Sequence, residues 1–158
     1  MEYKNAATYW IAALFVIGNI ALPQLCHLVP SGGPMLLPIY FFTLVAAYKY
    51  GWKVGLLTAV LSPLVNSALF AMPAPAVLPA ILTKSLLLAA AAGFAARKFR
   101  RVSLLLLLGV VLFYQVIGSA AEWALTGSLT AALQDFRIGI PGMLLQILGG
   151  YLFIKYLK

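Results

Sequence analysis

The feature that most limits how this chain can fold is a series of long apolar segments with almost no charge inside them. A bilayer has a hydrocarbon core about 30 Å thick, and a helix needs about 20 apolar residues to cross it. Hydrophobic residues make up 64% of the 158 and charged residues only 9%, a balance that excludes an ordinary soluble domain. The pattern predicts an all-α integral membrane protein with six transmembrane helices, over residues 6–22, 35–48, 54–72, 76–96, 102–125 and 138–156.

The segment 35–48 is the weakest of the six, because it is short and contains Pro38. A re-entrant segment is the alternative. With six spans and a cytoplasmic N-terminus, Arg137 is the one basic loop residue on the external side, whereas five spans would place Lys4 opposite other basic clusters. The positive-inside rule therefore favours six spans with both termini in the cytoplasm of a multi-pass inner or plasma membrane protein. The cytoplasmic set is then Lys4, Lys49, Lys53, Arg97, Lys98, Arg100, Arg101, Lys155 and Lys158.

The formal net charge of +8 comes mainly from these basic residues at the ends of the predicted spans. Basic residues grouped beside apolar segments determine orientation at the lipid headgroups. We therefore expect the lipid bilayer, and no nucleic acid, as a partner.

The connections divide into two kinds. Those assigned to the cytoplasm are short and basic, whereas the external ones, 23–34, 72–76 and 126–142, are rich in proline and glycine. Fixed proline φ angles stiffen loops, so we expect a mostly irregular outer surface that caps a site reached from outside. Six helices leave no room for a nucleotide-binding or catalytic domain, and residues 1–158 are predicted to form one transmembrane domain.

Small residues form a stripe at Ala89, Ala92, Gly93 and Ala96. Their three- and four-residue spacing places them on one helix face, where another helix can approach closely. Packing within the chain is the favoured interpretation. Docking on a partner membrane subunit is the alternative.

Motifs of soluble enzymes are absent from the sequence, with no phosphate-binding loop, HExxH motif, paired cysteines or nucleophile elbow. A single cysteine, Cys26, excludes an intrachain disulfide. We therefore expect no enzyme activity, no metal and no cofactor.

Apart from Lys155 at the inner end of the last span, two charged residues lie inside predicted spans, where each costs at least about 2.5 kcal/mol unless it is paired or hydrated. Lys84 lies in the outer half of the fourth span, and Glu122 lies near the outer end of the fifth. Gln115 and Ser119 share the face of Glu122 through helical spacing, and Gly118 leaves space beside them. In the third span Ser62 and Asn66 are also four residues apart, next to Pro63.

The polar residues on the third, fourth and fifth spans lie at matching depths in the membrane. They predict a polar and aromatic pocket that opens outward. The loop 23–34 would form its lid, with His27 available to contact substrate. The alternative is that Lys84 only pairs with Glu122, that Ser62 and Asn66 bond to their own helix, and that His27 and Cys26 pack as ordinary loop residues. The predicted wall consists of Lys84, Glu122, Asn66, Gln115, Tyr114 and Trp123.

The run GWKVGLLTAVLSPLVNSALFAMPAPAVLPAIL (51–82), together with the six short helices and the Gly/Pro loop after the first, resembles the S components of energy-coupling-factor (ECF) vitamin transporters. This resemblance implies a subunit that binds a vitamin or related micronutrient tightly and hydrolyses nothing. It also implies a membrane T component and two cytoplasmic ATPases as partners. The family often carries an Ala-x-x-x-Ala docking pair in the first helix, for which the nearest match here is Thr8 with Ala12.

Two other classes of function stay open. One is a small structural or assembly subunit of a membrane complex, which would need no outer polar pocket. The other is an ion-coupled carrier that uses Glu122 and transports without ATP. The sequence leaves the substrate open, because Lys84 suits a carboxylate or phosphate and Glu122 suits an amine or a heterocycle that donates hydrogen bonds.

Overall fold

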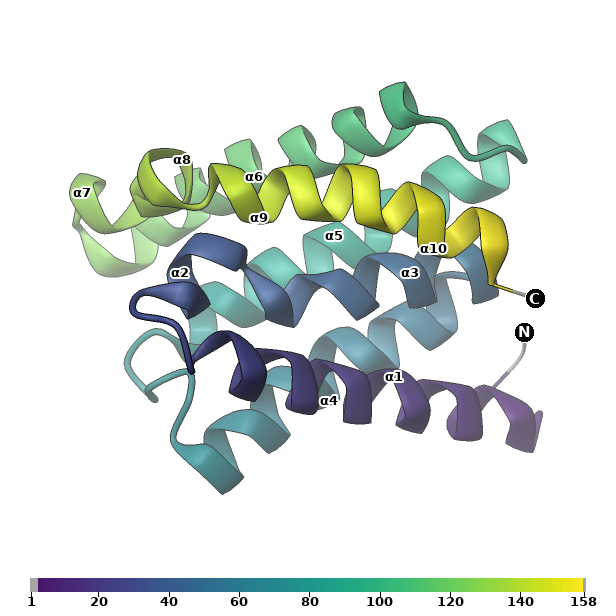
Figure 1. Ribbon diagram of the computed structural model, residues 1–158, viewed down its shortest axis with the longest axis horizontal. Helices are drawn as coiled ribbons and strands as arrows, with labels where there is room; N and C mark the ends of the chain where they lie inside the picture. Colours follow the sequence, from purple (N-terminus) through teal and green to yellow (C-terminus); the bar gives the residue numbers. More distant parts are fainter. Residues whose placement is uncertain (1–2, 158) are drawn as a thin grey trace.

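The computed structural model describes residues 3–157, and within that range every regular element is helical (Figure 1). The chain folds in the order α1 (Ala6–Cys26), α2 (Gly32–Leu36), the 3-10 turn η1 (Pro38–Tyr40), α3 (Phe41–Tyr50), α4 (Trp52–Phe70), α5 (Leu78–Phe99), α6 (Leu104–Thr126), α7 (Leu129–Ala132), α8 (Gln134–Ile138), α9 (Ile140–Leu144), the π-helical turn η2 (Leu145–Gly149) and α10 (Gly150–Tyr156).

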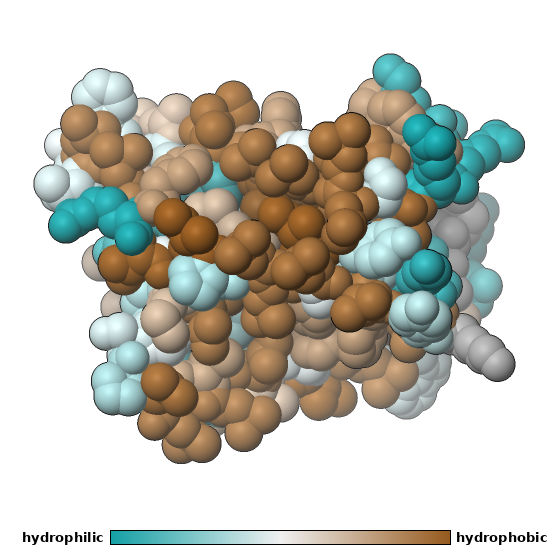
Figure 2. Space-filling view, turned by 45° about the horizontal axis from the view of Figure 1, so that its top comes forward, coloured by the Kyte–Doolittle hydropathy of each residue, from teal (hydrophilic) through white to brown (hydrophobic). Residues whose placement is uncertain are grey.

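Four of the described helices, α1, α4, α5 and α6, are long and apolar enough to cross a membrane. They contain 19 to 23 residues each, and apolar side chains cover much of their outer surface, including Trp10, Leu14 and Ile17 of α1. Figure 2 shows a brown apolar surface across the middle of the molecule, with hydrophilic side chains gathered toward its two ends. This distribution confirms a helical protein suited to lipid.

The helix α3 lies at the centre of the bundle rather than against lipid. It packs on α1, α4, α5 and α10, and Leu44, Val45, Ala46 and Ala47 are completely buried. The segment predicted as a second span, 35–48, is therefore not one membrane-length helix. It is divided at Pro38, and ten helical residues suffice because neighbouring helices cover them on all sides.

Both chain ends lie at the same end of the bundle, and we call this the terminal end (Figure 1). There, Tyr48 donates a hydrogen bond to the carbonyl of Arg101 (2.7 Å), and Lys49 donates one to the carbonyl of Ile154 (3.3 Å). The short helices α2, α7 and α8 lie at the opposite end. The expectation of a mostly irregular outer surface was therefore wrong for residues 126–142, where α7, α8 and the start of α9 follow α6 in close succession.

A neutral polar cluster joins three helices inside the bundle. Asn19 of α1 donates to the hydroxyls of Thr43 on α3 (3.0 Å) and Ser62 on α4 (3.1 Å), and accepts from the backbone N–H of Phe42 (3.2 Å). The carbonyl of Asn19 lacks its helical donor, because the residue four positions later is Pro23. Asn66 of α4 supplies the missing bond at 2.7 Å. We call Asn19, Thr43, Ser62 and Asn66 the Asn19 cluster.

The small residues of α5 pack within the chain, as the favoured interpretation of their stripe predicted. Ala89 and Ala92 are fully buried, and a Cβ atom on Gly93 would lie only 2.6 Å from the Cβ of Trp52. Thr8 and Ala12 of α1 are also buried, at 0% and 2% exposure. Neither set of small residues is therefore available on the surface of the isolated chain for docking.

Candidate functional site

A cavity of about 450 Å³ lies at the end of the bundle opposite the termini. Its walls come from the end of α1, from α2 and η1, from the α4–α5 connection, and from α5, α6, α7 and α8. Most of the lining is apolar, and the polar groups are few. The lining residues are Pro23, His27, Gly33, Pro34, Leu37, Pro38, Ile39, Tyr40, Ala71, Met72, Pro73, Ala74, Val77, Ile81, Lys84, Glu122, Ala131, Gln134 and Asp135.

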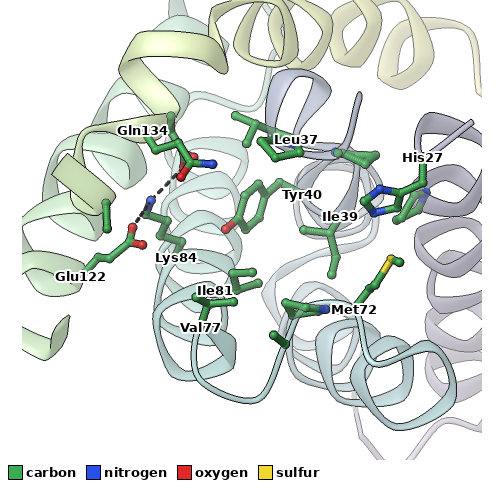
Figure 3. Close-up of a pocket in the computed structure, with 18 of the residues that line it drawn as sticks. His27, Leu37, Ile39, Tyr40, Met72, Val77, Ile81, Lys84, Glu122 and Gln134 are labelled. Carbon is green, nitrogen blue, oxygen red and sulfur yellow. Dashed lines mark hydrogen bonds and ion pairs between the residues drawn. The ribbon is translucent and has the colours of Figure 1, made fainter. Parts of the chain in front are cut away.

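Three charged residues meet at one side of this cavity (Figure 3). The ammonium nitrogen of Lys84 on α5 lies 2.6 Å from Glu122 Oε2 on α6 and 2.8 Å from Asp135 Oδ2 on α8. Lys84 is only 3% exposed, whereas both carboxylates are 13% exposed. A charge at this depth is tolerated when it is paired, so these residues, which we call the Lys84 cluster, hold three separate helices together.

A glycine makes the position of Lys84 possible. Gly118 lies one turn before Glu122 on α6, and a Cβ atom there would come within 2.5 Å of Lys84 Cγ. The aliphatic stem of Lys84 therefore fills the space that the missing side chain leaves. The sequence had indicated space beside this face of α6, and the structure shows which group occupies it.

Tyr40 and His27 supply further polar groups to the cavity. Tyr40 is 3% exposed, its ring lies 5.3 Å from that of Tyr114, and its hydroxyl points toward the Lys84 side (Figure 3). His27 lies at the other side of the cavity in the same view, where its imidazole packs directly on Gly33. Ile39 and Met72 lie between these two sides, so polar groups flank an apolar middle.

The structure places the predicted site residues in three different regions. Lys84, Glu122 and His27 line the cavity. The pairing of Lys84 with Glu122, predicted only as the alternative to a pocket, is also present, so the two possibilities are not exclusive.

Tyr114 and Gln115 lie behind the cavity and are completely buried. The Tyr114 hydroxyl donates to Gln146 Oε1 (2.9 Å) and accepts from Gln115 Nε2 (3.0 Å). Gln146 belongs to the π-helical turn η2, a type of distortion that is common near functional sites. These residues support the rear wall, through the contact of Tyr114 with Tyr40, and do not line the cavity.

Asn66 and Trp123 lie away from the cavity lining. Asn66, predicted as part of the pocket wall, instead belongs to the Asn19 cluster, and both Ser62 and Asn66 bond to Asn19 of α1, which also differs from the alternative that they bond to their own helix. Trp123 is 53% exposed on the outer surface of α6. Cys26, which precedes His27 in the sequence, is buried and does not line the cavity.

Sequence reasoning missed Asp135 and Tyr40. Asp135 is the one aspartate of the chain, but it lies in the segment 126–142, and no periodicity reveals that this segment packs against α2 and α6. Tyr40 lies in the 3-10 turn η1 before α3. In such a short turn the spacing of apolar residues does not predict which side chains face the interior. The signals for Asp135 and Tyr40 were an acidic residue in an external connection and an aromatic residue two positions after a proline.

The cavity can bind and orient a small molecule through an ion cluster, two aromatic side chains and apolar walls. Among residues 3–157, no group of three or more His, Cys, Asp and Glu side chains is arranged to hold a metal ion. The charged groups that line the cavity are held by one another at hydrogen-bond distance. Binding is thus the chemistry that the geometry supports.

No protein-family model matches the sequence, and neither a curated protein nor a solved structure matches it.

Proposed function

We propose that this chain is the substrate-binding subunit of an ECF-type importer, and that it binds a water-soluble vitamin or related micronutrient in the cavity beside Lys84. In this proposal the chain crosses the inner or plasma membrane six times with both termini in the cytoplasm. The cavity then faces outward. A membrane T component and two cytoplasmic ATPases supply the energy, and the chain itself hydrolyses no ATP.

The observation that carries the proposal is the cavity with a buried ion cluster in its wall. About 450 Å³ falls within the range of small-molecule sites, roughly 300 to 1,000 Å³, which combine apolar walls with a few oriented polar groups. A purely structural subunit has no use for charged groups that face such a space. An ion-coupled carrier would use Glu122 as a titrating group, but this carboxylate is held by Lys84 at 2.6 Å.

The distribution of basic residues supports the orientation. Lys4, Lys53, Lys98 and Lys155 lie near the ends of helices on the terminal side, and three of them stack on aromatic rings. Lysines that rest on aromatic side chains are typical of the headgroup region. Asp135 and Glu122 lie at the other end, which fits an external face under the positive-inside rule.

The six-span arrangement requires that α3 and the segment α9–α10 each complete a pass. In Figure 1 both run between the cavity end and the terminal end, beside the four long helices. Because α3 is surrounded by other helices, its ten residues need not match the bilayer thickness. A reporter fused after residue 158 is expected to remain in the cytoplasm, and an external reporter signal would contradict this topology.

The test of binding is thermal unfolding of the purified chain with a small-molecule filtrate of yeast extract, supplemented with the water-soluble vitamins. A molecule that binds only the folded state raises the melting temperature. We expect the filtrate to raise it and filtrate-free buffer to leave it unchanged. No stabilisation by the filtrate would refute the proposed function and return the cavity to a structural role.

The energising partners need a separate test. The purified chain is expected to show no ATPase activity and to accumulate no substrate in vesicles unless an ECF module is supplied. ATP-independent uptake by the chain alone would favour the ion-coupled carrier. Because Thr8 and Ala12 are buried, contact with a T component would use other residues.

A further inference from the structure

We propose that the cavity selects ligands with a positively charged nitrogen, such as a protonated amine or a cationic heterocycle, over ligands with a carboxylate or phosphate. This inference rests on the proposed function, since it names the class of molecule that the same cavity binds. The inferred ligand charge is opposite to the one that Lys84 alone would suit, since a single lysine favours an anion.

The charge balance of the cavity wall is the first argument. One ammonium group is held between two carboxylates, at 2.6 Å and 2.8 Å, so the Lys84 cluster carries one excess negative charge. An anionic ligand could reach Lys84 only by approaching Glu122 and Asp135, which would repel it. Arg137, on the same short helix as Asp135, is exposed and does not line the cavity.

The second argument is the unused bonding capacity of the carboxylates. Each one contacts Lys84 through a single oxygen, Oε2 of Glu122 and Oδ2 of Asp135. Among the described residues, no hydrogen bond engages Glu122 Oε1 or Asp135 Oδ1, and both side chains line the cavity. Carboxylate oxygens accept hydrogen bonds, and their strongest donors are charged N–H groups.

Tyr40 adds a polar group that a ligand at this side can use. Its side chain is almost completely buried, at 3% exposure, yet none of the described residues hydrogen-bonds to its hydroxyl. The hydroxyl points to the Lys84 side of the cavity (Figure 3). The hydroxyl oxygen itself is open to the cavity and is not among the fully enclosed polar atoms, so it can accept a hydrogen bond from a nitrogen donor placed against the two carboxylates.

The rest of the lining limits the shape of the ligand. Ile39, Ile81, Val77 and Met72 form an apolar middle between the Lys84 cluster and His27 (Figure 3). This arrangement fits a vitamin-sized molecule with its cationic nitrogen at the carboxylates, an apolar or aromatic body in the middle, and one hydrogen-bonding group near His27.

The test divides the vitamin-supplemented yeast filtrate into three portions, which are left untreated, passed over a cation-exchange resin or passed over an anion-exchange resin at pH 7. We expect the cation-exchange resin to remove the component that stabilises the protein and the anion-exchange resin to leave it. Loss on the anion-exchange resin alone, or stabilisation that survives both resins, would overturn the inference and leave the proposed function standing. An untreated filtrate without effect would refute both.

Charge variants test the same inference from the side of the protein. Asp135→Asn keeps the shape of the side chain and removes the excess negative charge, so we expect half-maximal stabilisation to need roughly tenfold more filtrate. Because this variant also weakens the bond to Lys84, a gain of function is the sharper test. Gln134 lines the cavity next to Asp135, and Gln134→Glu adds a negative charge without removing a contact.

We expect Gln134→Glu to lower the half-maximal amount of filtrate roughly threefold. Thr130→Glu is the matched control, because Thr130 is exposed at the same end of the molecule but outside the lining. Unchanged or weaker binding by Gln134→Glu, or an equal gain in Thr130→Glu, would contradict charge selection by the cavity.

Discussion

Two polar clusters lie within this helical bundle, and they differ in charge and in what they face. The Asn19 cluster is neutral, joins α1, α3 and α4, and bonds to backbone groups that Pro23 and the start of α3 leave without helical partners. The Lys84 cluster is charged, joins α5, α6 and α8, and lines a cavity. Buried polar residues near the same end of a bundle can thus hold helices together in one case and also line a cavity in the other.

The largest effect is expected from breaking the charged cluster. Lys84→Met leaves two carboxylates without their shared cation, and removing one partner of a buried ion pair costs about 3 to 5 kcal/mol. Thermal unfolding in detergent should therefore show a strongly destabilised variant.

The apolar replacement of the whole Lys84 cluster is the control. Lys84→Met/Glu122→Leu/Asp135→Leu leaves no unpaired charge, so much of the stability should return, as often happens when a buried ion pair is replaced by apolar side chains. A single variant Lys84→Met that is as stable as the wild type would show that the ion pairs do not hold α5, α6 and α8 together.

The neutral cluster should give a smaller loss of stability and leave binding intact. Asn19→Leu removes three hydrogen bonds, including the acceptor for the N–H of Phe42, and we expect a loss of about 2 kcal/mol. Asn66→Leu removes only the bond to the Asn19 carbonyl and should cost less. If either folded variant lost the stabilisation by filtrate, the division between a structural and a binding cluster would be wrong.

A glycine substitution separates packing at the charged cluster from packing elsewhere on α6. In Gly118→Ala the new methyl group meets the stem of Lys84 at 2.5 Å, and overpacking of this kind costs about 1 to 3 kcal/mol. Gly109→Ala is the matched control on the same helix, since nothing lies within 4 Å of its Cβ position. Similar melting temperatures for the two variants would argue against the close contact of Lys84 with α6.

The smallest effect is expected at the far side of the cavity. His27→Ala should weaken binding by roughly three- to tenfold, the equivalent of one ordinary hydrogen bond or less. Trp123→Ala should leave binding unchanged, because Trp123 is exposed on the outside of α6. Titration with the filtrate compares the two, and a larger loss in Trp123→Ala would favour the pocket as the sequence alone predicted it.

The sequence predicted the long helices well because length and apolar composition are sufficient evidence for them. It also placed Lys84 and Glu122 at matching depths, since residue number along a straight helix gives height directly. It could not show that α3 is central, because a fully buried helix and a lipid-facing one have the same apolar composition.

The candidate site was predicted where it lies on the long helices α5 and α6, and at His27 directly after α1. Asp135 depends on how residues 126–142 pack against α2 and α6, which brings its carboxylate to Lys84, and such tertiary contacts have no periodic signal. Asn19 had a local signal that was overlooked, an amide four residues before Pro23, where the proline leaves a carbonyl without its donor. Trp123 was assigned from its distance to Glu122 along the chain, although adjacent residues of a helix point in different directions.

The most direct test of the central claim compares the wild-type chain with the triple variant Lys84→Met/Glu122→Leu/Asp135→Leu, both as monodisperse species in detergent. The melting temperature of each is measured with and without the vitamin-supplemented filtrate. A binding site at the Lys84 cluster predicts that the filtrate raises the melting temperature of the wild type and leaves that of the triple variant unchanged. An equal rise in both proteins would contradict the account, because the cluster would then play no part in binding.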